Sequence, residues 1–168
     1  MKKILGNCTI EFDREKTAEY CSKTTRCCCE PCKNFNKLVR EKYPKLTAYL
    51  EQFGIDITSP EEMVWHIHSK EKQTVEYTPI YTVNGQLIAA NEAKKSFSDK
   101  SQNLTIHFNN DAFFENAEIS GPYFEIYVDT VILPWQMEEP FDDVFSDEIT
   151  SIPNDISTTK KSGCFKNL

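Results

Sequence analysis

The sequence has few glycines and no long apolar segment. Only five glycines occur among the 168 residues, and none of them are clustered. The chain therefore lacks the glycine-rich loop that cradles phosphates, and it also lacks the serine elbow of hydrolases. No apolar segment approaches the ~20 residues that a membrane-spanning helix requires. The apolar stretch near the start ends after Ile4-Leu5, so we expect no export signal, a cytoplasmic protein and no membrane partner.

Basic residues are absent from one long segment. Between Ser101 and Thr159 there is no lysine or arginine but there are twelve acidic residues, so this segment carries −12. The whole chain carries −7, which leaves +5 for the remainder. Such a separation argues against a nucleic-acid partner and favours a basic protein partner. A solubilising surface that partly neutralises a basic helix explains the charges equally well.

The densest acids of this segment lie near its end. We predict that they form the partner-binding surface, and they are Glu138, Glu139, Asp142 and Asp143.

Four of the seven cysteines lie close together in the sequence, at positions 27, 28, 29 and 32. In a reducing compartment such cysteines are typically thiols or metal ligands rather than disulfides. Cys29 and Cys32 have the C-x-x-C spacing that supplies zinc with two ligands from one turn, and Cys27 can supply a third. A second C-x-x-C pair is missing, so the fourth donor must come from elsewhere. The candidates are Cys21, Cys28, Cys8 and a histidine of the sheet, and we include Cys21 in the predicted zinc site.

Two other interpretations of these cysteines remain open. Small buried thiols can pin the start of a helix by packing alone. Redox chemistry is the third interpretation, because a helix N-terminus and the neighbouring Lys33 both lower the pKa of a thiol at Cys32. No local signature of a cysteine nucleophile is present, so a catalytic role is disfavoured. His66 and His68 are two residues apart on a predicted strand, so they share one face, and metal sites on sheets use this spacing. We prefer the interpretation that the two histidines line the half-exposed face of an amphipathic strand and bind no metal.

Hydrophobic periodicity predicts an α+β fold. An apolar stripe at helical spacing runs from Lys33 to Phe53 and is interrupted by Pro44, which predicts two helices or one kinked helix. Alternating apolar residues predict an antiparallel sheet of about five or six strands, with this N-terminal helical pair packed on one face. Asn84-Gly85 is the sequence of a two-residue hairpin turn. The polar, lysine-rich segment from Glu92 to Asn103 predicts a loop.

The same patterns predict three regions. Residues 1–26 form an N-terminal strand, a short helix and a loop. Residues 27–137 form the α+β core domain, which contains the cysteines, the helices and the sheet. Residues 138–168 form an acidic strap followed by a disordered tail.

One set of motifs resembles a family of small bacterial proteins whose activity is uncharacterised. The resemblance covers residues 27–140 and rests on Cys27-x-Cys29-x-x-Cys32-x-Asn34-Phe35, a helix ending in Phe53-Gly54-Ile55-Asp56, a Pro60-Glu61-Glu62 turn and Leu133-Pro134-Trp135. It implies a bacterial cytosolic single domain. It marks Cys27, Cys29, Cys32 and Asn34 as motif positions and assigns no metal.

The sequence thus favours a non-catalytic binding protein with a basic protein partner. A zinc-binding or redox-sensing domain that uses the segment from Cys27 to Cys32 is the first alternative. An immunity-type protein that masks a basic toxin is the second, by analogy with other small acidic α+β domains.

Overall fold

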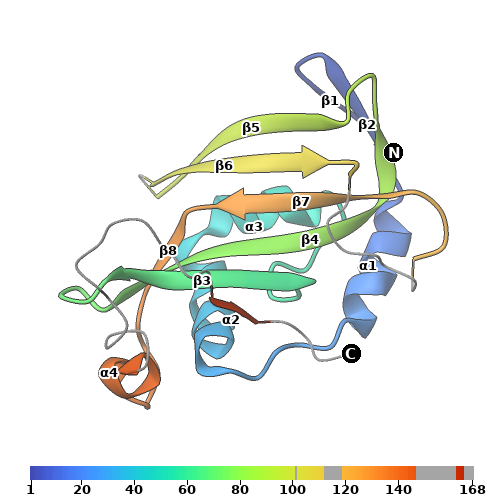
Figure 1. The fold of residues 1–168 in the computed structure, drawn as a ribbon. Coiled ribbons are helices and arrows are strands. Elements are labelled where there is room, and N and C mark those ends of the chain that lie inside the picture. Colours follow the sequence, from blue (N-terminus) through green and yellow to red (C-terminus); the bar gives the residue numbers. More distant parts are fainter. Residues whose placement is uncertain (101, 112–118, 147–161, 165–168) are drawn as a thin grey trace.

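The computed structural model describes residues 1–100, 102–111 and 119–146 and the backbone of residues 162–164 (Figure 1). The fold is α+β, as predicted, with four described helices and nine described strands. In chain order the elements are β1 (Lys2–Leu5), β2 (Cys8–Phe12), α1 (Arg14–Lys23), α2 (Glu30–Lys42), α3 (Pro44–Glu51), β3 (Glu62–Ser69), β4 (Thr74–Ile88), β5 (Glu92–Asp99), β6 (Gln102–Asn109), β7 (Tyr123–Asp129), β8 (Val131–Pro134), α4 (Phe141–Val144) and β9 (Ser162–Cys164). None of the described helices has the length and apolar character needed to cross a bilayer.

All the strands join in one antiparallel sheet, so the predicted count of five or six strands is too low. Its main order is β1-β2-β4-β7-β6-β5, and β3 and β8 also pair with β4, while the short β9 pairs with β3. β4 is 15 residues long. Its first half pairs with β3 and β8, and its second half pairs with β7 and then with β2. This strand therefore connects all parts of the sheet.

The predicted hairpin turn at Asn84-Gly85 is wrong, because β4 continues through both residues. Asn84 pairs with Tyr123 of β7, and Gly85 pairs with Phe12 of β2. A Cβ atom on Gly85 would lie 2.1 Å from the carbonyl oxygen of Glu11. Glycine is present at this position because another backbone approaches it closely, which is a known use of glycine within strands.

The predicted loop at residues 92–103 is also wrong, because it contains β5 and the start of β6. β5 pairs residue by residue with β6, from Glu92↔Asn109 to Asp99↔Gln102. Two polar residues of β5 interact with α3, which packs against the sheet. The Lys95 ammonium lies 4.4 Å from the centre of the Tyr49 ring, and a carboxylate oxygen of Asp99 accepts the backbone N–H of Leu46 at 2.9 Å. These tertiary contacts let a polar segment form a strand.

The predicted interruption of the helical pattern at Pro44 is present, although the two helices cover Glu30–Lys42 and Pro44–Glu51 rather than the predicted span from Lys33 to Phe53. Asp13 caps α1 by accepting the backbone N–H of Lys16, and Pro44 is the first residue of α3, directly after the break that ends α2. α2 and α3 both lie against the same face of the sheet (Figure 1). The apolar residues that carry the helical and alternating patterns lie between the helices and the sheet. Trp65 among them is partly exposed, and the others are buried, namely Phe35, Leu38, Leu46, Leu50, Phe53, Tyr81, Val83, Ile106, Phe124, Ile126 and Val128.

The predicted acidic strap contains the short helix α4. Phe141 and Phe145 of this segment pack edge-on against Trp135, with ring centres 6.0 and 5.2 Å away, and Phe145 also meets Trp65 at 5.5 Å. The tail predicted to be disordered lies outside the described residues, apart from residues 162–164, whose backbone forms β9. The boundaries of the three predicted regions stay predictions.

Replacing Gly85 by alanine tests the close contact between β2 and β4. We expect Gly85→Ala to lower the free energy of unfolding by roughly 2–4 kcal/mol, because the new methyl group clashes with the backbone of Glu11. Urea denaturation measures this loss. Gly121→Ala is the control, since Gly121 also has a positive φ (+101°), but no atom of the described residues lies within 4 Å of a Cβ added there. Equal losses in the two variants would show that the close approach is unimportant.

Candidate metal centre

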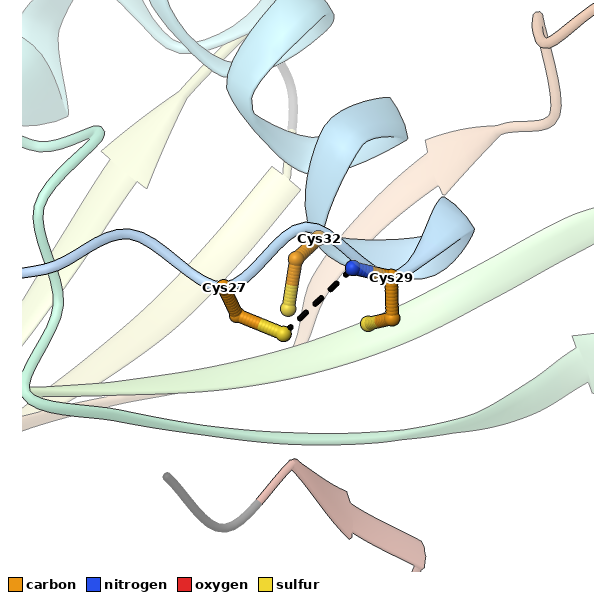
Figure 2. A group of neighbouring side chains, drawn as sticks. All are labelled: Cys27, Cys29 and Cys32. Carbon is orange, nitrogen blue, oxygen red and sulfur yellow. Dashed lines mark hydrogen bonds between the residues drawn. The ribbon is translucent and has the colours of Figure 1, made fainter. Parts of the chain in front are cut away.

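Three cysteines converge where α2 begins. Cys27 precedes the helix, Cys29 is its N-cap residue, and Cys32 lies in its first turn. Their three Sγ atoms all lie within 4.8 Å of one another. Figure 2 shows the side chains pointing to the same side of the chain, with the backbone N–H of Cys29 donating to Cys27 Sγ at 3.5 Å. The predicted C-x-C-x-x-C segment therefore forms a three-sulfur cluster, which we call the cysteine cluster.

The cysteine cluster borders a small cavity. Cys32 is only 4% exposed, whereas Cys27 and Cys29 are half-buried. Cys27 and Cys32 line a cavity of about 20 Å³ together with Asn36 and Met63, and a space of this size holds about one water molecule. Among the described residues, none donates a hydrogen bond to the buried Oδ1 of Asn36. The cavity thus has room for one small group and a spare acceptor beside it.

Two electrostatic effects oppose each other in the cysteine cluster. The N-terminus of a helix carries partial positive charge, which favours thiolates, whereas burial, as at Cys32, disfavours any charged group. Lys33, which the sequence suggests as a second cationic influence, donates to the Glu30 carboxylate at 2.5 Å, so its charge is partly neutralised. Burial raises the pKa of Tyr77, and negative charge on the nearby Cys32 and Cys29 raises it further, so its hydroxyl stays neutral.

The fourth predicted zinc ligand, Cys21, lies apart from the cysteine cluster. Cys21 is buried in α1 and lines a different cavity with Gly54 and Asp56. Burial raises the pKa of its thiol, which disfavours the thiolate. Cys28 is exposed and is not part of the cysteine cluster either. The structure thus gathers three of the four predicted ligands.

The backbone of Cys164, which the sequence does not single out as a fourth zinc ligand, pairs with a strand that borders the same cavity. β9 pairs with β3 so that Cys164 is opposite Met63, and Met63 lines the cavity beside Cys27 and Cys32. The tail that contains Cys164 carries no strand signal, so only the structure places this residue near the cysteine cluster. Cys164 is therefore the first cysteine to test as a fourth ligand.

Asn34 joins the cysteine-bearing helix to the end of the sheet. This side chain is fully buried. Its amide nitrogen donates to the Tyr77 hydroxyl and to the Pro134 carbonyl, both at 3.1 Å, and its oxygen accepts the backbone N–H of Gln136 at 2.9 Å. The two ends of the sequence pattern that resembles the bacterial family, around Asn34 and around Pro134, are thus in direct contact.

The other predicted site residues lie on the surface. Glu138, Glu139, Asp142 and Asp143 are all exposed around α4, as a partner-binding role requires. His66 and His68 are exposed on β3, away from the cysteine cluster.

Comparisons of the chain with protein-family models, curated proteins and solved structures found no match. The resemblance to a bacterial family stays a prediction, and the function is argued below from the geometry of the site.

Asn34→Ala tests the link between α2 and the sheet. We expect the free energy of unfolding to fall by about 2–4 kcal/mol, because the variant leaves the N–H of Gln136 and the carbonyl of Pro134 unsatisfied. Thermal or urea denaturation measures the change. Asn36→Ala, two residues further along the same helix, removes an amide oxygen that accepts no hydrogen bond from the described residues and should cost less than about 1 kcal/mol. Similar losses for both variants would contradict this role of Asn34.

Proposed function

We propose that this chain is a non-catalytic protein whose cysteine cluster binds one zinc ion. The observation that carries the proposal is the convergence of three sulfur atoms within 4.8 Å of one another. In a tetrahedral zinc site with Zn–S bonds of about 2.3 Å, neighbouring sulfur atoms lie about 3.8 Å apart. Small side-chain rotations bring Cys27, Cys29 and Cys32 to that spacing. The cavity beside Cys27 and Cys32 leaves space for a fourth donor.

Zinc is favoured over other metals by the donor set. Thiolates select zinc, copper(I) and iron–sulfur clusters rather than magnesium or calcium. An iron–sulfur cluster is usually held by four cysteines, whereas zinc accepts three together with a different fourth donor. A zinc ion bound here would fix the turn from Cys27 to Cys32. Because Asn34 connects the same helix to the end of β8, the ion would also stabilise the contact between α2 and the sheet.

A redox-sensing function is the second candidate. Cys29 is half-buried at a helix N-terminus, the position at which thiols are most readily ionised and oxidised. In this case an oxidant such as hydrogen peroxide would take two electrons and two protons from two of the three clustered cysteines, which would then form a reversible disulfide while the peroxide is reduced to two water molecules. The two candidates differ in one measurable respect, because only zinc binding predicts that the thiols are protected until a chelator is added.

The partner remains a separate prediction. The predicted acidic residues lie in α4 and in the segment just before it, and this region is held by the contacts of Phe141 and Phe145 with Trp135. A fixed, exposed set of carboxylates suits a basic protein surface. An immunity-type protein that masks a basic toxin is a special case of this prediction.

Metal analysis of single cysteine variants tests the zinc proposal. We expect the protein purified under reducing conditions to contain one zinc ion per chain by native mass spectrometry. Cys29→Ser should weaken zinc binding by about 10- to 100-fold or more, because it removes one of the ligands. Cys28→Ser is the matched control, since Cys28 is adjacent in sequence but exposed and outside the cysteine cluster.

Two outcomes of this experiment would contradict zinc binding. One is a metal-free wild-type protein that takes up no added zinc, and the other is equal zinc affinity in Cys29→Ser and Cys28→Ser. A metal-free protein with one fast-reacting thiol would favour the redox candidate instead. Cys164→Ser, measured in the same way, shows whether the fourth ligand comes from the C-terminal strand.

Neutralising the acidic surface tests the partner prediction. The variant carries Glu138→Gln, Glu139→Gln, Asp142→Asn and Asp143→Asn. We expect it to bind a polylysine peptide at least about tenfold more weakly than wild type at low salt, and we expect wild-type binding to weaken as salt is added. The control neutralises the same number of exposed acids elsewhere, namely Glu15, Glu19, Glu71 and Glu92. Equal weakening in both variants would show that only net charge matters.

A further inference from the structure

All three arginines of the chain line one cavity. The 19 basic residues include only three arginines, which are Arg14, Arg26 and Arg40. They come from α1, from the segment before α2 and from α2, yet all of them line the same solvent-open cavity of about 880 Å³, which we call the arginine cavity. No lysine of the described residues lines it. A cavity of this volume accommodates a small organic molecule.

The arginine cavity lies where the loop after α3 approaches α1. Gly54 of this loop has a positive φ (+85°), and a Cβ atom placed on it would clash with the backbone of Arg14. The Arg14 side chain reaches to the end of α3, where its Nε donates to the carbonyl oxygen of Glu51 at 3.2 Å. Cys21 and Ile55 are buried members of the lining. The cavity is thus built from packed segments rather than from one exposed loop.

Asp56 orients two of the three guanidinium groups. Its carboxylate accepts hydrogen bonds from Arg26 at 3.1 Å and from Arg40 at 2.6 Å. Burial raises the pKa of Asp56, but hydrogen bonds from Thr58 and the charges of the two arginines outweigh burial and hold this pKa below its ordinary value. Asp56 is therefore ionised. A guanidinium has five N–H donors, so both arginines keep donors for a ligand after they bond to Asp56.

Arg14 is the arginine that ion pairs within the protein do not explain. Among the residues that the structure describes, no carboxylate pairs with its side chain. The terminal nitrogens of its guanidinium are therefore available in a cavity that already contains two other guanidinium groups. Glu51 and Asp56 add negative charge, but the charged side chains of the lining still sum to +1, whereas the whole protein carries −7. The arginine cavity is thus a positive site on an acidic protein.

We propose that the arginine cavity binds a small molecule through an oxyanion group, a phosphate or a carboxylate, with Arg14 as the principal contact. The planar fork of arginine bonds such a group through two parallel N–H donors, which the point charge of a lysine cannot do. This geometry explains why the chain has arginine at these three positions. Pairing with Asp56 alone would account for Arg26 and Arg40 but not for Arg14.

Arginine Nε–H signals in NMR spectra of the full-length protein test this proposal, because three arginines give only three such signals. The probes are inorganic phosphate and succinate, each added at constant ionic strength. We expect at least one of them to shift the Arg14 signal along a saturable curve, with a Kd of about 10 mM or below. Tighter binding of phosphate identifies the ligand group as a phosphate, and tighter binding of succinate identifies it as a carboxylate.

Three variants show whether the arginine cavity is the binding site. Arg14→Lys should weaken binding about tenfold although it keeps the charge, because it removes the two-donor contact. Lys16→Gln should leave binding unchanged and is the matched control, since Lys16 lies on the same helix but does not line the arginine cavity. Glu51→Gln should tighten binding at least about twofold, because it removes negative charge from the lining. Misfolding cannot produce such a gain.

The proposal is overturned if neither probe shifts the Arg14 signal along a saturable curve. It is also overturned if Arg14→Lys binds the probe as tightly as wild type, or if Lys16→Gln causes the same loss as Arg14→Lys. The Cys29→Ser variant separates this site from the zinc proposal above, because it should bind the probe as tightly as wild type even where it loses zinc.

Discussion

The long strand β4 is the constraint on which the rest of the structure depends. A single strand of 15 residues pairs with β2, β3, β7 and β8. Its two faces also have different surroundings. Tyr77 lies below α2 and accepts a hydrogen bond from Asn34, close to the cysteine cluster, while the neighbouring Glu76 lies below the histidines of β3. The alternation of one strand therefore places the cysteine cluster and the exposed histidines of β3 on opposite faces of the sheet.

The buried amide of Asn34 adds specificity to this arrangement. An unpaired amide in a protein interior is costly, whereas a fully bonded one is well tolerated. Asn34 finds its partners only when α2, β4 and the end of β8 are all in place. Asn34 thus disfavours any packing in which α2 is shifted along the sheet. Apolar contacts alone do not distinguish the correct position of the helix in this way.

The parts of the fold that depend on local signals were predictable from sequence. Pro44 marks a helix boundary through its own backbone chemistry, and alternation marks the strands around Ile106 and Ile126. The errors occurred where distant residues decide the outcome. Gly85 occupies a strand because β2 approaches it, and Lys95 belongs to a strand because Tyr49 covers its ammonium group.

The features of the candidate sites also fall into those set by local sequence and those set by distant residues. The spacing of Cys27, Cys29 and Cys32 is short enough for the sequence alone to predict that their sulfur atoms meet. The separation of Cys21 from them, and the backbone position of Cys164, follow from tertiary pairing and leave no mark in the local sequence. The contacts of His66 and His68 with Glu76 could not be predicted from local sequence either, because they depend on the register between β3 and β4 and on a bulge in β3.

The hydrogen bonds of Asn34 also have a consequence for folding during synthesis. Its backbone partners at Pro134 and Gln136 lie 100 and 102 residues further along the chain. Contacts of such long sequence separation form late, because the entropy of closing the intervening loop must be lost first. While the ribosome is still making the sheet, α2 can form but cannot complete its buried hydrogen bonds. The domain therefore completes its fold only after residue 136 has left the ribosome.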